Sequence, residues 1–252
     1  MAQVTPVNTP SLLFRAADER FHSQRGWLDS WHSFSFAGHH HPDWMGFGPL
    51  RVINDDTIAA GEGFGMHPHR DMEIITVMVD GELTHADSMG HSAVLRAGEV
   101  QRMSAGTGIV HSEINRSNAP CRLLQIWIEP DQGGLAPAYE QKPITIGSDW
   151  TALIHPDAAA PAMAIASNTR LWRARPQTGQ SLAIPAEPAA RIWVQVIAGE
   201  LELRMDHGAT QRLQRGDGLG ITGPVPAPCN LVGLTPGADV LLFAMTTATA
   251  MA

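Results

Sequence analysis

Two short stretches decide the fold of this 252-residue chain: Val79-Asp80-Gly81-Glu82-Leu83 and Ile197-Ala198-Gly199-Glu200-Leu201. In each one, an apolar run enters a Gly-Glu-Leu turn. A second glycine with an acidic neighbour follows seventeen residues after the first, as Gly98-Glu99 in one copy and Gly216-Asp217 in the other. The copies lie 118 residues apart (199 − 81), and two motifs repeated at one spacing indicate a duplicated β-domain.

The rest of the chain has the pattern of antiparallel β-structure. Short apolar or alternating runs are separated by Gly, Asp and Pro, as in a barrel or sandwich: Leu50–Ile53, Ile74–Val79, Ala93–Arg96 and Leu123–Ile128. We therefore predict an all-β protein in which two similar barrels pack together, the first over residues 1–145 and the second over residues 146–252. A short helix is predicted around Thr9–Glu19.

The composition excludes two classes of protein. Hydrophobic residues make up 44% of the chain and charged residues 17%, which is typical of a globular rather than a disordered protein. Asp and Glu total 25 against 17 Lys and Arg, a formal charge of −8. The chain therefore lacks the basic surface that binds nucleic acid directly.

No segment is typical of membrane insertion or secretion. The longest uncharged stretch, Gly218–Ala238, is interrupted by Gly and Pro, and the chain before Arg15 has no basic residue and no long apolar run. The two cysteines, Cys121 and Cys229, lie far apart and give no sign of a disulfide framework. We therefore predict a cytoplasmic protein with no membrane partner.

Histidine is distributed unevenly along the chain. Ten of the 12 histidines fall within the first 111 residues. Two segments there have the spacing of metal ligands on strands: His67-Pro68-His69 and His111-Ser112-Glu113. Residues i and i+2 of a strand project from one face about 6.6 Å apart along the backbone, so each pair can converge on one ion. Three histidines and a carboxylate suit a divalent first-row metal with open positions for substrate and oxygen.

Other residues near these pairs allow further interpretations. Glu73 has the side-chain parity of the first pair, and it is either an alternative ligand to Glu113 or a base beside the site. The run His39-His40-His41 is typical of a solvent-exposed loop. His85 and His91 flank a turn, and we expect them to be turn residues rather than ligands.

The repeat offers an internal control for the metal site. Adding 118 to His67, His69, His111 and Glu113 gives Pro185, Glu187, Cys229 and Leu231. The second barrel has therefore lost three or four of the same groups, and we predict one metal site per chain, in the first barrel.

A dense set of motifs lies between Phe47 and Asn115: FGPLRVINDD, HPHRDMEIIT, DSMGHS and GEVQRMSAGTGIVHSEIN. Together with Ser33-Phe34-Ser35-Phe36 upstream, they closely resemble the pirin family of the cupin superfamily. The resemblance implies two cupin barrels (double-stranded β-helices, or jelly rolls) packed face to face, with one iron in the N-terminal barrel. It also assigns metal ligation to the four residues that the spacing selects: His67, His69, His111 and Glu113.

The chain departs from the general cupin pattern in both of its motifs. Seven residues rather than six separate Glu73 from Gly81, Ser104 stands where proline is usual, and His111 comes two residues late. These shifts favour Glu113 over Glu73 as the carboxylate ligand.

The resemblance also implies an activity. Some pirin-like proteins are quercetin 2,3-dioxygenases, which open the central ring of a flavonol with O2 and release carbon monoxide. We therefore expect an Fe(II)-dependent dioxygenase of flavonol-like aromatics, in which Glu113, or Glu73 if it is free, accepts the substrate proton as general base. The same ligands also accept Mn, Co, Ni, Cu or Zn.

The resemblance leaves a second class of function open. Pirins are also described as metal-dependent regulators whose iron senses redox state and which bind a transcription factor or a metabolic enzyme. The acidic charge of this chain suits a protein partner better than DNA.

Overall fold

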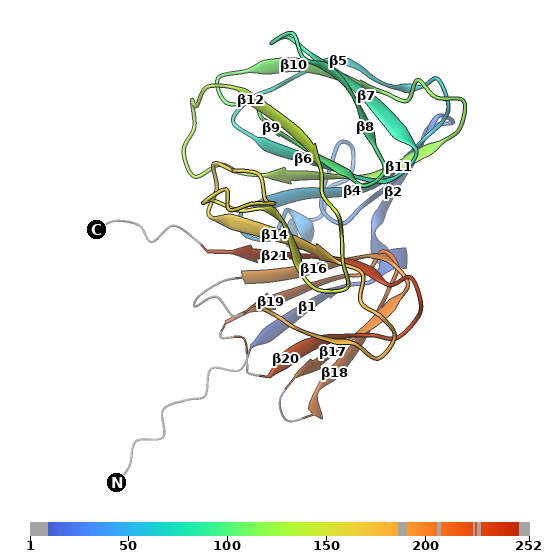
Figure 1. Ribbon diagram of the computed structural model, residues 1–252, viewed down its shortest axis with the longest axis vertical. Coiled ribbons are helices and arrows are strands. Elements are labelled where there is room, and N and C mark those ends of the chain that lie inside the picture. Colours follow the sequence, from blue (N-terminus) through green and yellow to red (C-terminus); the bar gives the residue numbers. More distant parts are fainter. Residues whose placement is uncertain (1–9, 186–190, 206–207, 224, 226–227, 247–252) are drawn as a thin grey trace.

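Two β-barrels lie one above the other in the computed structural model (Figure 1), which describes residues 10–246 apart from 186–190, 206–207, 224 and 226–227. The cupin fold with two barrels, predicted above, is confirmed. Among the described residues, helical structure is limited to two 3-10 turns, η1 (Ala17–Glu19) and η2 (Pro42–Trp44). Neither these nor any other described segment forms a helix with the length and hydrophobicity needed to cross a membrane.

The N-terminal barrel consists of a seven-stranded sheet, in the order β12-β9-β6-β11-β4-β3-β2, and a four-stranded sheet, in the order β5-β10-β7-β8. Its strands are β2 (Phe21–Gln24), β3 (Leu28–His32), β4 (Leu50–Ile58), β5 (Gly63–His69), β6 (Glu73–Asp80), β7 (Glu82–Asp87), β8 (Ser92–Arg96), β9 (Glu99–Ser104), β10 (Ile109–Ile114), β11 (Cys121–Ile128) and β12 (Ala138–Pro143).

The C-terminal barrel repeats this plan with a six-stranded sheet, β1-β19-β16-β21-β14-β13, and a four-stranded sheet, β15-β20-β17-β18. Its strands are β1 (Ser11–Arg15), β13 (Thr151–Ile154), β14 (Thr169–Ala174), β15 (Ser181–Ala183), β16 (Arg191–Ala198), β17 (Glu200–Met205), β18 (Thr210–Gln214), β19 (Gly218–Thr222), β20 (Cys229–Gly233) and β21 (Asp239–Met245).

The glycines of the repeated motif have the same role in both barrels. Gly81 and Gly199 adopt φ values of 73° and 69°, in the left-handed region that favours glycine. A Cβ on Gly81 would lie 2.8 Å from the Cβ of Cys121, and one on Gly199 would lie 2.7 Å from the Cα of Ala238. Each motif therefore begins with glycine because the tight turn into the next strand leaves no room for a side chain.

The helix predicted around Thr9–Glu19 is wrong over most of its described part, where only Ala17–Glu19 forms a 3-10 turn. Ser11–Arg15 forms strand β1, which pairs antiparallel with β19 of the second barrel, with Phe14 opposite Leu219. The physical reason is long-range, because the edge of β19 offers backbone hydrogen bonds that outweigh a weak local helical pattern. Residues at the start of the chain thus complete the sheet of the C-terminal barrel.

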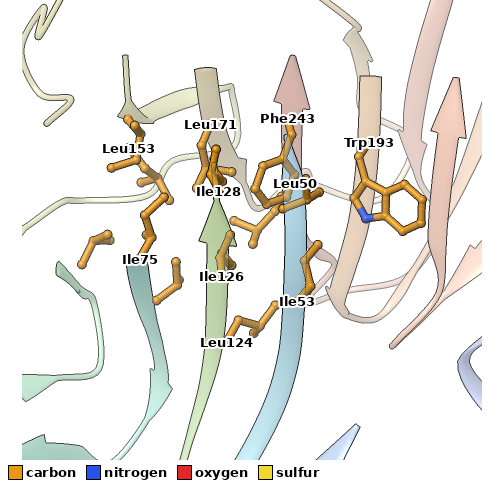
Figure 2. Packing of buried hydrophobic residues seen from close by; sticks show 14 of the residues in the cluster. Leu50, Ile53, Ile75, Leu124, Ile126, Ile128, Leu153, Leu171, Trp193 and Phe243 are labelled. Carbon is orange, nitrogen blue, oxygen red and sulfur yellow. The ribbon is translucent and has the colours of Figure 1, made fainter. Parts of the chain in front are cut away.

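A large apolar core joins the two barrels (Figure 2). Side chains from β4, β6 and β11 of one sheet, among them Ile53, Ile75 and Ile126, meet side chains of the other sheet such as Leu171 and Phe243. All five are buried, with at most 1% of each exposed. The two large sheets therefore pack face to face, and this packing leaves the small sheets on the outside of the molecule (Figure 1).

The barrel interiors differ from each other. One continuous apolar cluster fills the C-terminal barrel. The N-terminal barrel has two smaller apolar clusters instead, one around Leu83 and Met78 and one around Ile74 and Met103. Buried polar side chains of β6, β9, β10 and β11 occupy the rest of its interior, and they surround the candidate site.

Candidate metal centre

Three histidines meet on the inner face of the small sheet of the N-terminal barrel. His67 and His69 lie on β5, and His111 lies on β10 directly opposite His67. The ring centroids are 4.4 Å apart for His67 and His111, 4.8 Å for His67 and His69, and 4.9 Å for His69 and His111. One nitrogen of each ring lies within 4.8 Å of the other two, so the three rings can share one ion.

A β-bulge shapes the strand that carries two of these rings. The register between β10 and β5 shifts between His111 and Glu113, so that Glu113 lies opposite Phe64. Because of this shift, Phe64 and His67 line the same cavity although they are three residues apart. Gly63 begins the strand, and a Cβ there would lie 2.2 Å from the Glu113 carbonyl oxygen, so only glycine allows this close approach.

His69 and His111 are held in the form that binds metals. Burial, together with the neighbouring His67, lowers the pKa of His69 to about 4. Burial and the nearby imidazoles lower the pKa of His111 to about 3. Both rings are therefore neutral at neutral pH, and neutral imidazole is the state that donates a lone pair to a metal.

Hydrogen bonding around the rings fits a divalent metal. His111 is fully buried, yet neither of its ring nitrogens has a hydrogen-bond partner among the described residues. A buried polar atom without a partner costs about 1–3 kcal/mol, and a metal ion would satisfy one of these nitrogens. Nδ1 of His67 lies 2.7 Å from the Gly65 carbonyl oxygen and donates to it, which leaves Nε2 free to bind an ion.

Glu113 is buried beside His111. Nε2 of Gln125 donates to its carboxylate at 2.7 Å. Oγ1 of Thr76 lies 3.3 Å from the carboxylate and directs its one proton mainly at Oε1 of Gln125, at 2.8 Å. Burial raises the pKa of Glu113 to about 7. One carboxylate oxygen lies within 4.8 Å of ring nitrogens of His85 and His111, so Glu113 forms a second group that shares His111 with the group of His67, His69 and His111.

His85 is a site residue that sequence reasoning missed. It does not lie in a turn as expected, because it sits within β7 with only 1% exposed and pairs across the ladder with Glu113. Its Nε2 contacts Oδ2 of Asp87 at 3.1 Å, and its Nδ1 has no hydrogen-bond partner in the described part of the chain. The sequence does contain a signal for this position: His85 is two residues after the apolar Leu83, so on a strand both side chains point to the same, buried face. His91 is exposed beside the turn, as expected.

Glu73 does not reach the cavity. It begins β6 in the large sheet, where Ser104 donates to its carboxylate at 2.8 Å and the backbone of Ala166 adds a further hydrogen bond. The chain turns between β5 and β6 at Asp71, which has a φ of 46°, so the parity of His69 is not carried on to Glu73. Glu73 therefore belongs to the contact between the two barrels.

The cluster forms one wall of a cavity of about 220 Å³. His67, His69 and Glu113 line this wall. Apolar side chains line much of the remainder: Leu28, Phe36, Phe64 and Trp127. The opposite side is polar and comes from β2, β3 and β4: Ser23, Ser30, His32, Asn54 and Asp56.

The second barrel has no equivalent centre in its described residues. In the part of the chain that the structure describes, both groups of three His, Cys, Asp or Glu side chains that could hold a metal ion include His111. Cys229 and Leu231 take the places of His111 and Glu113 on β20, and Pro185 follows β15. The position corresponding to His69, Glu187, lies outside the described residues.

Comparisons with known proteins place the chain in a family. The profile of the family described as Pirin matches residues 14–128, and the profile described as the quercetinase C-terminal cupin domain matches residues 152–245. A protein of Escherichia coli strain K12 named quercetin 2,3-dioxygenase is 45% identical over 213 residues, which cover 83% of this chain and 89% of the relative. The chain belongs to the pirin family.

Solved structures resemble this pirin over nearly its whole length. The bacterial pirin YhhW from Escherichia coli, in complex with nickel(II), superposes with a TM-score of 0.86 at 38% identity and covers 94% of this chain and 100% of that chain. A quercetin 2,3-dioxygenase from Acinetobacter baumannii has a TM-score of 0.73 at 18% identity and covers 95% of this chain and 80% of that one, a likeness in fold alone. The chain is thus a member of a cupin dioxygenase family with a histidine cluster that fits a divalent metal.

Proposed function

We propose that this pirin is an iron-dependent dioxygenase that opens a ring of a flavonol-like aromatic substrate with O2 and releases carbon monoxide. The observation that carries the proposal is the cluster of three histidines at the wall of a cavity, in a chain 45% identical to a protein named quercetin 2,3-dioxygenase. Four side chains would hold Fe(II): His67, His69, His111 and Glu113.

The donor set supports this use of a metal. When bound, a divalent metal would draw electron density from a substrate hydroxyl, lower its pKa and place it beside O2. Neutral imidazoles leave most of the positive charge of the ion uncompensated, which favours an anionic substrate. Gln125 and Thr76 hold the Glu113 carboxylate close to His111. We therefore assign Glu113 to the metal, and the residue that takes up the substrate proton is considered separately below.

The cavity supports a hydroxylated aromatic substrate. Phe36, Phe64 and Trp127 present ring surfaces to it, and Leu28 adds an aliphatic one. Polar groups line the metal side and the wall of β2, β3 and β4, and Arg25 and Gln125 add two more. A planar molecule with an apolar body and hydroxyl groups at its edges matches this distribution.

The two barrels would have different roles. The N-terminal domain, residues 1–145, would hold the metal and the substrate, and the C-terminal domain, residues 146–252, would bind no metal and cover the large sheet of the first. We also propose that the protein works in the cytoplasm, since Cys121 and Cys229 are both free thiols buried in separate barrels.

Anaerobic loading with Fe(II) tests the proposal. We expect one iron per chain, followed by O2 uptake and carbon monoxide release when quercetin is added. His67→Ala and Glu113→Gln should lose both iron and uptake, whereas exposed His40→Gln should keep them. Stoichiometric iron without uptake on any flavonol would reject the dioxygenase and favour a metal-dependent regulator that binds a protein partner.

A further inference from the structure

The wall opposite the histidine cluster contains a buried carboxylate with no part in metal binding. Asp56 lies on β4, lines the cavity and is only 3% exposed. Ser30 on β3 donates a short hydrogen bond to its Oδ1 atom. Because burying a carboxylate is costly, a carboxylate placed at a cavity wall calls for a functional reason.

A chain of hydrogen bonds leads from this carboxylate toward the surface. Nδ1 of His32 lies 3.3 Å from Oγ of Ser30, and Nε2 of His32 lies 2.9 Å from Oγ of Ser23. Oγ of Ser23 lies 2.9 Å from Nε2 of His39, a half-buried residue of the histidine-rich loop. Four links thus connect Asp56 to solvent.

The donors along this chain point inward, toward Asp56, and the Nδ1 proton of His32 is shared between Asn54 at 2.7 Å and Ser30 at 3.3 Å. Nδ1 of His32 lies 2.7 Å from Oδ1 of Asn54, which only accepts, so Nδ1 carries the proton and Nε2 accepts from the Ser23 hydroxyl. The Ser23 oxygen then accepts from Nε2–H of His39, and Ser30 donates to Asp56. A series of aligned donors of this kind can pass protons between a buried group and the surface.

We propose that Asp56 is a catalytic residue that takes the proton of a ligand hydroxyl in this cavity, and that the chain of Ser30, His32, Ser23 and His39 exchanges this proton with solvent. The proposal rests on the proposed function, because it supplies the proton acceptor that an aromatic hydroxyl needs once Glu113 is assigned to the metal.

The proton transfer is balanced without any further reactant. The O–H bond of the ligand breaks, an O–H bond forms on Asp56, and the electron pair stays on the ligand oxygen, facing the histidine cluster. For the proton to leave, the hydroxyls and imidazoles first turn so that each donates outward, with His32 in its other tautomer, and each then passes on one proton toward His39. No oxidant or reductant is needed for this step.

The charges around Asp56 support proton exchange near neutral pH. Burial raises the pKa of Asp56 to about 7, and the carboxylates of Asp55 on the same strand and Glu113 on β10 act in the same direction. The Ser30 hydroxyl on β3 opposes them. From β11, the Cys121 thiol is the titratable group coupled to Asp56, and its own raised pKa keeps it neutral.

The second barrel lacks this arrangement. Ile53 of β4 pairs with Ile126 of β11. In the second barrel Leu171 of β14, 118 residues after Ile53, pairs with Phe243 of β21, 117 residues after Ile126. Three residues beyond Leu171, the place of Asp56 is taken by Ala174, which is buried in an apolar cluster. Asp56 and its hydrogen-bond chain therefore occur in the barrel with the histidine cluster, as a role in its chemistry requires.

Stopped-flow absorption without O2 tests the role of Asp56. The probe is quercetin, and the protein is loaded with Zn(II), which is redox-inactive, so the deprotonated probe accumulates without turnover. We expect Asp56→Asn to bind metal normally but to slow probe deprotonation by about 10²-fold or more, as for loss of a general base. Formate should restore part of the rate in Asp56→Ala. A wild-type rate in Asp56→Asn would overturn the assignment.

The outer links are tested with a matched pair of loop variants. His39→Gln and Ser23→Ala should slow deprotonation at low buffer concentration, and added imidazole buffer should restore the rate. His40→Gln, which changes the exposed neighbour of His39, should behave like the wild type. Equal rates in His39→Gln and His40→Gln at low buffer would exclude His39 from the path.

A measurement without substrate separates this proposal from the proposed function. The infrared band of the protonated Asp56 carboxyl, identified by its absence in Asp56→Asn, should exchange rapidly on transfer to D2O and more slowly in Ser23→Ala. If the wild type fails to deprotonate or consume quercetin, the proposed function is wrong, while the exchange rate still tests the chain. Exchange at the same rate in Ser23→Ala would overturn the chain.

Discussion

The two barrels share one backbone plan but differ in what fills them. Glu113 pairs with His85 in the first barrel, and 118 residues later Leu231 pairs with Leu203 in the second. The same holds across the large sheets, where the row Gln101, Thr76 and Gln125 corresponds to the row Leu219, Val194 and Leu242. At every one of these positions, the first barrel has a polar side chain and the second barrel has an apolar one.

This difference shows how a site is added to a β-barrel without changing its frame. The apolar row gives the second barrel a continuous core, whereas the polar row divides the core of the first into two parts. The polar side chains satisfy one another, since Thr76 donates to Gln125 at 2.8 Å and Gln125 donates to Glu113. The network keeps the buried carboxylate in place, and the second barrel has nothing of this kind at Leu231.

The largest effect is expected when a carboxylate is placed in the apolar interior of the second barrel. We expect Leu231→Glu to lower the free energy of unfolding by about 5 kcal/mol, because a packed leucine is lost and a charge is buried without partners. Burial raises the pKa of a carboxyl, so its ionised form is the destabilising one and the loss should shrink as the pH falls from 8 to 5.

Chemical denaturation at both pH values measures this effect. Leu231→Gln, which has the same shape without the charge, is the control and should lose less stability with no pH dependence. A loss below about 2 kcal/mol for Leu231→Glu, within the range of ordinary substitutions, would mean that the second barrel accommodates a carboxylate as readily as the first.

A second comparison concerns two Arg–Asp ion pairs. In the first barrel the earlier strand carries the aspartate, and in the second barrel the earlier strand carries the arginine. Asp55 on β4 pairs with Arg122 on β11 at 2.8 and 2.9 Å, whereas Arg173 on β14 pairs with Asp239 on β21 at 2.8 and 2.7 Å. We expect Asp239→Asn to cost about 3–5 kcal/mol, because Arg173 would be left charged and buried.

Asp55→Asn should cost less, since the Arg122 side chain is 14% exposed against 1% for Arg173. Urea unfolding of the two variants side by side gives the difference. Equal losses would show that water reaches both pairs to the same extent.

Metal binding should stabilise the first barrel alone. At a metal concentration of 100 Kd, we expect Ni(II) or Zn(II) to raise the free energy of unfolding by about 2.7 kcal/mol. His111→Ala should abolish this gain. Thermal unfolding with and without metal measures it, and Cys229→Ala, which changes the corresponding position of the second barrel, should retain it in full. A gain that survives in His111→Ala would place the metal elsewhere.

The smallest effect concerns a single hydroxyl of the polar row. Thr76→Val installs the residue that the second barrel has at this position, and we expect it to cost about 1 kcal/mol through the lost hydrogen bond to Gln125. The reverse change, Val194→Thr, is the matched control and should cost at least as much, because its hydroxyl would enter an apolar core. A gain in stability for Thr76→Val would mean that the network is kept for the site alone.

Much of the candidate site could be predicted from the sequence. The alternation of side chains along a strand is local, so His67 and His69 could be placed on one face, and His111 with Glu113 on another, without knowledge of their pairing. The choice between Glu113 and Glu73 could not be made in this way, because the turn at Asp71 moves Glu73 into a different sheet.

Residues outside the two pairs of predicted ligands were the hardest to predict. Asp56 and His32 belong to strands of the large sheet, and only the closure of the barrel brings them to the wall opposite the histidines. His39 was expected in a solvent-exposed loop, and the loop is present, but its ring turns inward to Ser23. Burial of this kind depends on which segments cover the barrel, and a loop sequence does not contain that information.

The sequence by itself determined the duplication, the all-β class and the placement of three histidines on strands. These features depend on turns at glycine and on the alternation of side chains along a strand, which act over a few residues. Only the tertiary structure decided that β1 crosses to the second barrel, that His85 faces the centre, and that Asp56 ends a hydrogen-bond chain. These features arise from contacts between segments far apart in the chain, such as Ser11 opposite Thr222. Such contacts depend on how whole sheets close and pack, which no local pattern encodes.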